Sequence, residues 1–368
     1  MKRNQQNNSM DRQRGAALLI LAVVLILTVV IIMVGKNSRN ADKLQREENV
    51  TKRLADAKEA MISIAVANSV LSGVLLYPDR AGGGGFDGGD DCHGGFNPQT
   101  TPGLLMGRLP FIGNGAGGCA ASVPTSLDIG QSMNPNEDAR PLHYVISQNL
   151  VEFTAVGPPA LANTINANVV TEGDGWLTVY DGNGNIIGAN VAFIIFYPGA
   201  ALPGQDRTLP VADAAEYLES FTVPIIGLVD NADPPAITPA PSNYVAAAES
   251  ATFNDKLVFV TANDLMRRVE LAMLNRIAVQ LAADFNPVVF PVDQAALVAV
   301  APYNAAPFSH WLVTQNTYDD DDGNPLVIDG YPFSVTYSTT ALLCNGVPFT
   351  GAVVIGIPEL GDQCAGAN

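Results

Sequence analysis

The N-terminal part of the chain contains one long apolar run. Residues 16–35 carry no charge, and Thr28 is the only polar interruption. At about 1.5 Å per residue, a helix over this run spans ~30 Å, the thickness of the hydrocarbon core of a bilayer. The run is also longer than the ~7–15 apolar residues of a cleaved secretory signal, and it lacks a small-x-small exit. It therefore predicts a membrane-spanning helix.

The charges before this run predict its orientation. The basic residues there outnumber the single acid, Asp11, and they are Lys2, Arg3, Arg12 and Arg14. By the positive-inside rule, residues 1–15 stay in the cytoplasm and the remainder of the chain crosses the membrane. The predicted topology is a single pass through the inner membrane with a large extracytoplasmic head.

A polar segment after the run extends the predicted helix. Residues 40–72 contain neither Pro nor Gly. Within this segment, positions recurring every three or four residues mark one helical face: Leu54, Ala57, Met61, Ile64 and Asn68. The pattern predicts one helix over residues 16–72, of which the first part spans the membrane and the second part is amphipathic.

Arg14, Gly15 and the apolar run that follows resemble the class III signal of type IV pilins and type II secretion pseudopilins. The resemblance implies that a prepilin peptidase cleaves after Gly15 and that the new terminus, Ala16, is methylated. It also implies assembly with other pilin or pseudopilin subunits. The protein would then pass from the inner membrane into a cell-surface pilus or a periplasmic pseudopilus.

Position 20 departs from the usual pattern of this family. Most pilins carry a Glu at the fifth residue of the mature chain, where it pairs with the terminal ammonium of a neighbouring subunit, whereas this chain has Ile20. A buried carboxylate is costly unless it is paired, so a subunit with no neighbour ahead of it has no need of one. In this respect the chain is similar to minor subunits, notably the tip pseudopilin of type II secretion, and a tip position is expected.

Three further segments are similar to blocks of a large, uncharacterised group of pilin-leader proteins of Gram-negative bacteria. These segments are residues 53–68, 191–207 and 253–281. Because the function of that group is not established, the similarity bears on the fold and not on the mechanism.

The head has the pattern of an α+β fold. Two strand-like segments, 176–180 and 186–197, flank Asp181–Asn185, whose sequence DGNGN is typical of a hairpin turn. Further strands are expected at 256–260, 310–314, 333–340 and 352–357. Thr261 and Asp264 form a capping box before a helix whose apolar face is Leu265, Val269, Met273 and Ile277.

These patterns divide the chain into four predicted parts. They are a leader peptide (1–15), a membrane-spanning and assembly helix (16–72), a Gly/Asp-rich loop region stapled by disulfides (73–140) and an α+β head domain (141–368). Within the head, residues 231–243 read as a Pro-rich connector.

Charge and cysteine content fit an extracytoplasmic protein. The formal net charge is −17, which disfavours binding to nucleic acid. The four cysteines all follow the predicted span, where oxidation is expected, and they are Cys92, Cys119, Cys344 and Cys364. Two disulfides are predicted, and pairing within each sequence-local pair, 92 with 119 and 344 with 364, is the easiest to close.

The sequence lacks the usual catalytic motifs, so no enzymatic activity is expected. It has no phosphate-binding loop, no G-x-S-x-G turn and no H-E-x-x-H helix. His93, His143 and His310 stand in unrelated contexts and are expected to be ordinary surface or core residues. A zinc site at Cys92–His93 is less favoured than a disulfide, because no second ligand pair accompanies it.

Two acidic loops raise the question of calcium. Asp181, Asn183 and Asn185 alternate like the opening ligands of an EF-hand, but Ala192 stands where a bidentate Glu is required, which favours a hairpin turn. The second loop is denser in carboxylates and comprises Asp319, Asp320, Asp321, Asp322, Asn324 and Asp329. Such a loop is either well solvated, the favoured alternative, or bridged by a hard cation such as Ca²⁺.

Two classes of function remain open from the sequence. The first is a non-catalytic minor pilin or pseudopilin at the tip of a filament. The second is a membrane-tethered periplasmic binding or hydrolytic protein. Gly15 and its leader favour assembly, since a simple tether needs neither processing nor a helix that extends far beyond the membrane.

Overall fold

The computed structural model describes residues 44–67, 72–80, 86, 88–89, 102–110, 141–150, 175–207, 214–235, 242–285, 299–305 and 308, and the backbone of seven strands between 315 and 365. The chain divides into two compact units, Met1–Arg53 and Leu54–Asn368. In the first unit, the described residues 44–53 are helical, and Thr51 Oγ1 donates a hydrogen bond to the carbonyl of Glu47 at 2.9 Å. The elements described below belong to the second unit.

The second unit begins with helical residues 54–67. The predicted apolar face of this helix is confirmed as far as it is described, because Leu54, Ala57, Met61 and Ile64 are all buried. Position 68 lies outside the described residues. Among the helices of the described residues, none is both long and apolar enough to cross a membrane, and the predicted span at 16–35 is not within that set.

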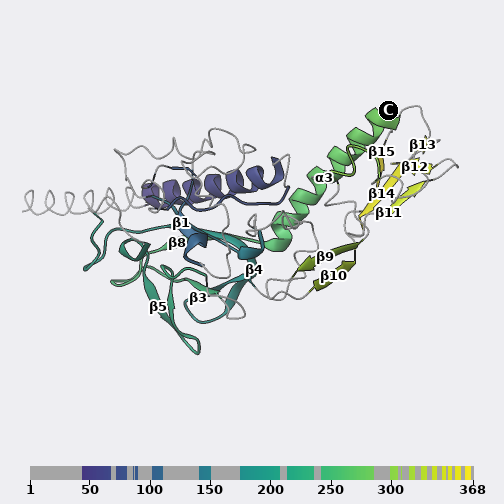
Figure 1. Cartoon of the computed structure of the whole chain (residues 1–368). Helices are drawn as coiled ribbons and strands as arrows, with labels where there is room; N and C mark the ends of the chain where they lie inside the picture. The colour runs from purple at the N-terminus through teal and green to yellow at the C-terminus, as the bar shows by residue number, and fades with distance from the viewer. Residues whose placement is uncertain are drawn as a thin grey trace, which may run out of the picture. The chain divides into compact units, whose positions relative to one another are not determined.

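A six-stranded sheet forms the centre of the second unit (Figure 1). Its strands are β1 (Met106–Arg108), β2 (His143–Ile146), β3 (Leu177–Asp181), β4 (Ile186–Tyr197), β7 (Ser242–Ala246) and β8 (Lys256–Thr261). The strand order is β1-β2-β4-β3-β7, and β8 pairs with β4. Every pair is antiparallel except β3 with β7.

The longest strand of the sheet, β4, pairs with three others. Its first half pairs with β3, and its second half pairs with both β2 and β8. All residues from Val191 to Tyr197 are buried, as expected for a central strand covered on both faces. The predicted hairpin at residues 181–185 is confirmed, since β3 ends at Asp181 and β4 begins at Ile186.

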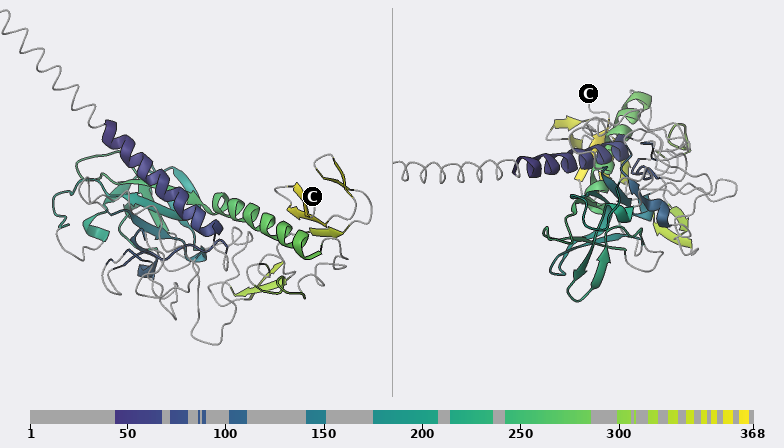
Figure 2. Two further views of the ribbon diagram at one scale, coloured as in Figure 1. Left: turned by 90° about the horizontal axis from the view of Figure 1, so that it is seen from above. Right: turned by 90° about the vertical axis from the view of Figure 1, so that its left-hand side faces the viewer.

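Two apolar clusters lie among the described residues of this unit. One packs on the sheet and comprises Met106, Val145, Leu177, Val179, Val191, Ile194, Phe196, Tyr217, Leu218 and Tyr244. The other lies beneath the β5–β6 hairpin (Ser220–Val223 and Gly227–Asp230) and comprises Val223, Val229, Val245 and Phe253. The views from the front and from above both place helical residues 54–67 over the sheet (Figures 1 and 2).

Helix α3 (Ala262–Phe285) follows β8 directly, and Thr261 and Asp264, the residues of the predicted capping box, interact at its start through the Thr261 hydroxyl. The backbone N–H of Asp264 donates to Thr261 Oγ1 at 3.1 Å, and Thr261 Oγ1 donates to Asp264 Oδ2 at 2.8 Å. The predicted apolar face is also confirmed, because Leu265, Val269, Met273 and Ile277 are all buried.

Removal of this cap is expected to destabilise the protein by about 1 kcal/mol. Thr261→Val keeps the β-branched shape that suits the end of β8 but deletes the hydroxyl that accepts from the Asp264 N–H. Thr261→Ser retains the hydroxyl and serves as the control. Urea unfolding of the three proteins measures the difference, and equal midpoints for Val and Ser would show that the cap contributes nothing.

The described strands after residue 314 form separate small sheets. They consist of β9 (Gln315–Asp319) with β10 (Pro325–Asp329), β11 (Ser334–Tyr337) with β14 (Val353–Ile357) and β15 (Gly361–Ala365), and β12 (Leu342–Cys344) with β13 (Val347–Phe349). Strands β11 and β14 fall within predicted segments, and β8 begins at the predicted residue and ends one residue later, whereas 310–314 lies outside the described residues. Short 3₁₀ turns at Pro102–Leu105, Gln148–Leu150 and Ala214–Glu216 complete the elements.

The described residues combine helices with mostly antiparallel strands, in agreement with the predicted α+β class. Strand β1 lies inside the region predicted to be a stapled loop, and it pairs with β2 of the predicted head, so residues 73–140 and 141–368 share one sheet. The predicted connector at 231–243 is also only partly a connector. Asn231 is fully buried at its start, and Ser242 and Asn243 at its end belong to β7.

Candidate functional site

The residues predicted for processing and assembly, Gly15, Ala16 and Ile20, lie outside the described residues. The same holds for Cys92 and Cys119. Cys344 ends β12, and Cys364 lies in β15 opposite Val354 of β14. The two predicted disulfides therefore remain predictions.

The described part of the acidic loop at 319–329 is a hairpin of β9 and β10. Asp319 pairs with Pro325 next to the loop, and Asp329 pairs with Gln315 at the other end of the strands. Four residues of strand separate the two ends, or roughly 13 Å.

Calcium binding at this loop remains a prediction. Within the part of the chain that the structure describes, no group of three or more His, Cys, Asp or Glu side chains could hold a metal ion, and residues 320–324 are outside that part. If the loop binds Ca²⁺, millimolar calcium should raise the melting temperature, because a ligand bound only by the native state stabilises it. The change Asp320→Asn with Asp322→Asn should abolish the shift. An equal shift in that double variant, or none in the wild type, would leave the solvated loop.

The other acidic loop is a hydrogen-bonded turn. Asp181 Oδ1 accepts from the backbone N–H groups of Asn183 at 2.9 Å and Asn185 at 2.8 Å, and Oδ2 accepts from Asn185 Nδ2 at 2.8 Å. These bonds lower the pKa of Asp181, the contacts with Asn185 having the largest effect. Its carboxylate oxygens are thus used by the turn, as the hairpin interpretation requires.

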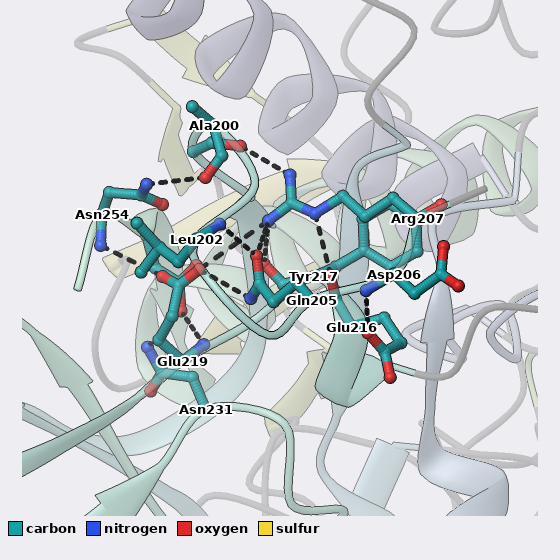
Figure 3. Close-up of polar contacts among 12 residues, drawn as sticks. Ala200, Leu202, Gln205, Asp206, Arg207, Glu216, Tyr217, Glu219, Asn231 and Asn254 are labelled. Carbon is teal, nitrogen blue, oxygen red and sulfur yellow. Dashed lines mark hydrogen bonds and ion pairs between the residues drawn. The ribbon is translucent and has the colours of Figure 1, made fainter. Parts of the chain in front are cut away.

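The described residues contain one extensive buried polar cluster, which is centred on Arg207 (Figure 3). The guanidinium donates to three backbone carbonyls, those of Gly199 at 2.7 Å, Glu216 at 2.8 Å and Tyr217 at 3.0 Å. It also donates to Gln205 Oε1 at 2.7 Å and lies 3.7 Å from Glu219 Oε1. Arg207 thereby joins the loop after β4 to the segment that leads into β5.

Glu219 and Asp255 form the acidic half of this buried polar cluster. Glu219 accepts from Gln205 Nε2 at 3.0 Å and from the backbone N–H of Asn254 at 3.0 Å. Asp255 Oδ2 accepts from the backbone N–H of Glu219 at 2.9 Å and from Asn231 Nδ2 at 3.2 Å. Both side chains are buried, so two carboxyl groups lie side by side with one nearby guanidinium.

The surroundings of one of these carboxyl groups favour its protonated form. Burial, followed by the hydrogen bond and negative charge of Glu219, raises the pKa of Asp255 to about 8. Asp255 Oδ2 already accepts two N–H donors, while Oδ1 receives none. The neighbouring carboxyl group of Glu219 therefore favours the protonated form of Asp255.

Asn231 connects the buried polar cluster to the sheet. Its side chain donates to the carbonyl of Val245 at 3.0 Å and accepts from the N–H of Val245 at 2.9 Å, as a neighbouring strand would. On the opposite side, Gly199 permits close packing, since a Cβ there would lie 1.9 Å from Asn254 Oδ1. The cluster thus occupies a space with no room for a larger residue at 199.

An aromatic and cationic group adjoins the same cluster. The ring of Tyr217 lies 4.9 Å from that of His143, and the guanidinium of Arg207 lies 5.0 Å from the Tyr217 ring. Arg108 stacks on Phe86 at 3.5 Å. Burial and the charge of Arg108 lower the pKa of His143 to about 3, so this histidine is a neutral core residue, one of the two roles that the sequence predicted.

A second set of polar contacts ties helical residues 54–67 to α3. Arg276 donates to the carbonyls of Val66 at 3.0 Å and Ala67 at 3.1 Å, and so satisfies acceptors at the end of the preceding helix. Arg268 and Glu59 form an ion pair at 2.6 Å, but both side chains are half exposed, so the pair contributes little to stability. Figure 2 shows the end of that helix beside the first turns of α3.

These contacts bring together three segments that are distant in the sequence. The β4–β8 pairing, the bond of Asn254 Nδ2 to the Ala200 carbonyl at 2.8 Å and the Arg276 contacts join residues 54–67, 191–207 and 253–281. Sequence reasoning singled out the segments but missed the roles of Arg207, Asn231 and Asp255. Of the three, only Asp255 lies directly before a predicted apolar strand, and this position was the one available signal.

The buried polar cluster can hold a proton and fix several loops, and the described contacts account for most of its polar atoms. Comparison of the chain with protein-family models, with curated proteins and with solved structures finds no match.

Proposed function

We propose that the protein is a non-catalytic minor pilin or pseudopilin that assembles through its N-terminal helix into a type IV pilus or type II secretion filament. The observation that carries this proposal is the uncharged run at 16–35. It directly follows Gly15 and is itself followed along the chain by an amphipathic helical segment. Such a helix would serve both as the membrane anchor before assembly and as the packing element afterwards.

The way in which the head holds helical residues 54–67 supports the proposal. One side of the helix is buried by apolar contacts, and its last carbonyls are bound by Arg276. A simple tether would need only a flexible linker between span and head. A helix fixed to the head can instead set the position of the head relative to neighbouring helices in a filament.

Ile20 supports a position at the tip of that filament. If no subunit lies ahead, a carboxylate at this position has no ammonium partner. Ile20→Glu should then leave incorporation unchanged or reduce it, and quantitative immunoblotting of sheared filaments measures this. Increased incorporation along the filament would assign the protein an internal position.

The mature N-terminus is the direct test of the proposed function. Mass spectrometry of the protein from its native host should find a chain that begins with methylated Ala16 and lacks residues 1–15. A terminus at any other residue would exclude the pilin-like processing on which the proposal depends, and would favour the membrane-tethered binding or hydrolytic protein.

A further inference from the structure

The turn between β5 and β6 exposes an apolar side chain in an unfavourable backbone conformation. Ile225 has a φ of +74° and is completely exposed, with a relative exposure of 104%. A positive φ suits Gly or Asn, whereas for a β-branched residue it is a rare and strained conformation. Neither solvation nor turn geometry therefore explains an isoleucine at this position.

The hairpin that carries Ile225 is firmly held by the core. Its inner face contributes the buried Val223 and Val229, which pack with Val245, and Phe221 lies edge-on to Phe253 at 5.3 Å between ring centroids. Pro224 further restricts the turn. The turn also rests against the β3–β4 hairpin, because a Cβ on Gly184 would lie 2.7 Å from the Pro224 carbonyl oxygen.

The outer face of the same hairpin is apolar as well. Leu228 is 71% exposed and lies opposite the exposed Thr222 in the β5–β6 register. Ile225 and Leu228 thus present two large apolar side chains from a preorganised hairpin, and little conformational entropy would be lost if they were buried by a partner.

The charge around this hairpin indicates what kind of partner it fits. We define the acidic lobe as residues 177–190, 220–235 and 242–250, which include β3, β5, β6 and β7. Its sequence contains Asp181, Asp230, Asp233 and Glu249 and no Lys or Arg. Anionic lipid would be repelled by such a lobe, and membrane-surface elements usually carry cations beside their apolar residues. A protein surface with cations around an apolar pocket is complementary to it.

We propose that the turn of the β5–β6 hairpin is a docking element, in which Ile225 and Leu228 enter an apolar pocket with a Lys/Arg rim on a partner protein. This interface is separate from the N-terminal helix and does not depend on how the N-terminus is processed. Docking would explain why the strained Ile225 is present. Gly or Asn would relieve the backbone strain, but either would remove the apolar side chain that enters the pocket.

Photo-crosslinking in cells that naturally produce the full chain tests this proposal. With Thr222→p-benzoylphenylalanine as the probe, we expect a cross-link to one other protein, at a peptide in which apolar residues adjoin Lys or Arg. Ile225→Asn should reduce the cross-link yield at least tenfold and leave the melting temperature of the purified protein equal or higher, because Asn tolerates positive φ. Val300→Asn, an exposed apolar position outside the lobe, is the matched control and should not change the yield.

Several results would overturn the proposal. They are the absence of a cross-link, a cross-link to lipid or to a second copy of the chain, an undiminished yield with Ile225→Asn, and a lower melting temperature for that variant, which would assign Ile225 to the fold. Flotation of the purified protein with vesicles of phosphatidylethanolamine and phosphatidylglycerol would identify a membrane surface as the target instead.

Discussion

Gly15→Val is expected to abolish removal of the leader peptide. In the proposed function, the residue before the scissile bond fits tightly into an intramembrane peptidase site, and a branched side chain does not fit there. The unprocessed chain keeps Lys2, Arg3, Arg12 and Arg14 in the cytoplasm. Moving each unpaired cation into hydrocarbon costs about 3 kcal/mol at the lower end of published scales, so the chain should stay in the inner membrane. Intact mass and cell fractionation measure both effects.

Gly15→Ala is the matched control for this experiment. Ala adds only a methyl group, and the variant should still be processed, even if more slowly. A Gly15→Val protein that still begins at Ala16 would show that the peptidase does not read this position. In that case the leader would be removed by another route and the pilin-like proposal would lose its main support.

Asp255→Asn is expected to make the protein less sensitive to alkaline pH. The pKa of Asp255 is raised to about 8 in the folded protein, against ~3.9 for an unfolded Asp. Between these values the native state binds one more proton than the unfolded state, so stability falls as pH rises, by up to about 1.4 kcal/mol per pH unit. Asn resembles the protonated carboxyl group and can donate to Glu219 at any pH, which removes this dependence.

The pKa of His143 is shifted in the opposite direction, and this shift determines the pH range in which the effect of Asp255 can be measured. Its pKa of about 3 lies below the unfolded value of ~6.5, so between these values the unfolded state binds more protons and stability rises with pH. The two groups oppose each other from about pH 4 to pH 6.5. From about pH 6.5 to pH 8 only Asp255 of these two groups binds more protons in the native state, and wild type should lose about 1.5 kcal/mol relative to Asp255→Asn.

Urea unfolding at several pH values tests this prediction. Glu249→Gln removes an exposed acid and provides a control for the change in net charge. If Asp255→Asn and wild type lose stability in parallel between pH 6.5 and pH 8, then Asp255 is already ionised in the native protein at pH 6.5. The pair of Asp255 and Glu219 would then hold no proton in this range.

The elements that could be predicted from the sequence are those with local signals. In the DGNGN turn, the side chain of Asp181 accepts hydrogen bonds from residues of the same turn. At the start of α3, Thr261 accepts from the backbone N–H of Asp264, three residues later. The buried face from Leu54 to Ile64 follows from helical spacing alone. In each case the residues that form the structure are neighbours in the chain.

What could not be predicted depends on residues that are far apart in the sequence. Strand β1 is only three residues long, and its partner β2 begins 35 residues after it ends. The buried polar cluster unites Arg207, Asn231 and Asp255 from three different connections, so each one alone resembles an ordinary surface residue. The exposed Ile225 is likewise unremarkable until its backbone conformation is known.

The Arg276 contacts have a mechanical consequence. A force applied along the axis of helical residues 54–67 is transmitted to α3 through the hydrogen bonds that Arg276 donates to the Val66 and Ala67 carbonyls. Because α3 continues from β8, which pairs with β4, the load reaches the centre of the sheet through covalent bonds. The force is then shared by many strand hydrogen bonds at once, so the rate of forced unfolding should be set by rupture of the β4–β8 pair and not by peeling of the helix.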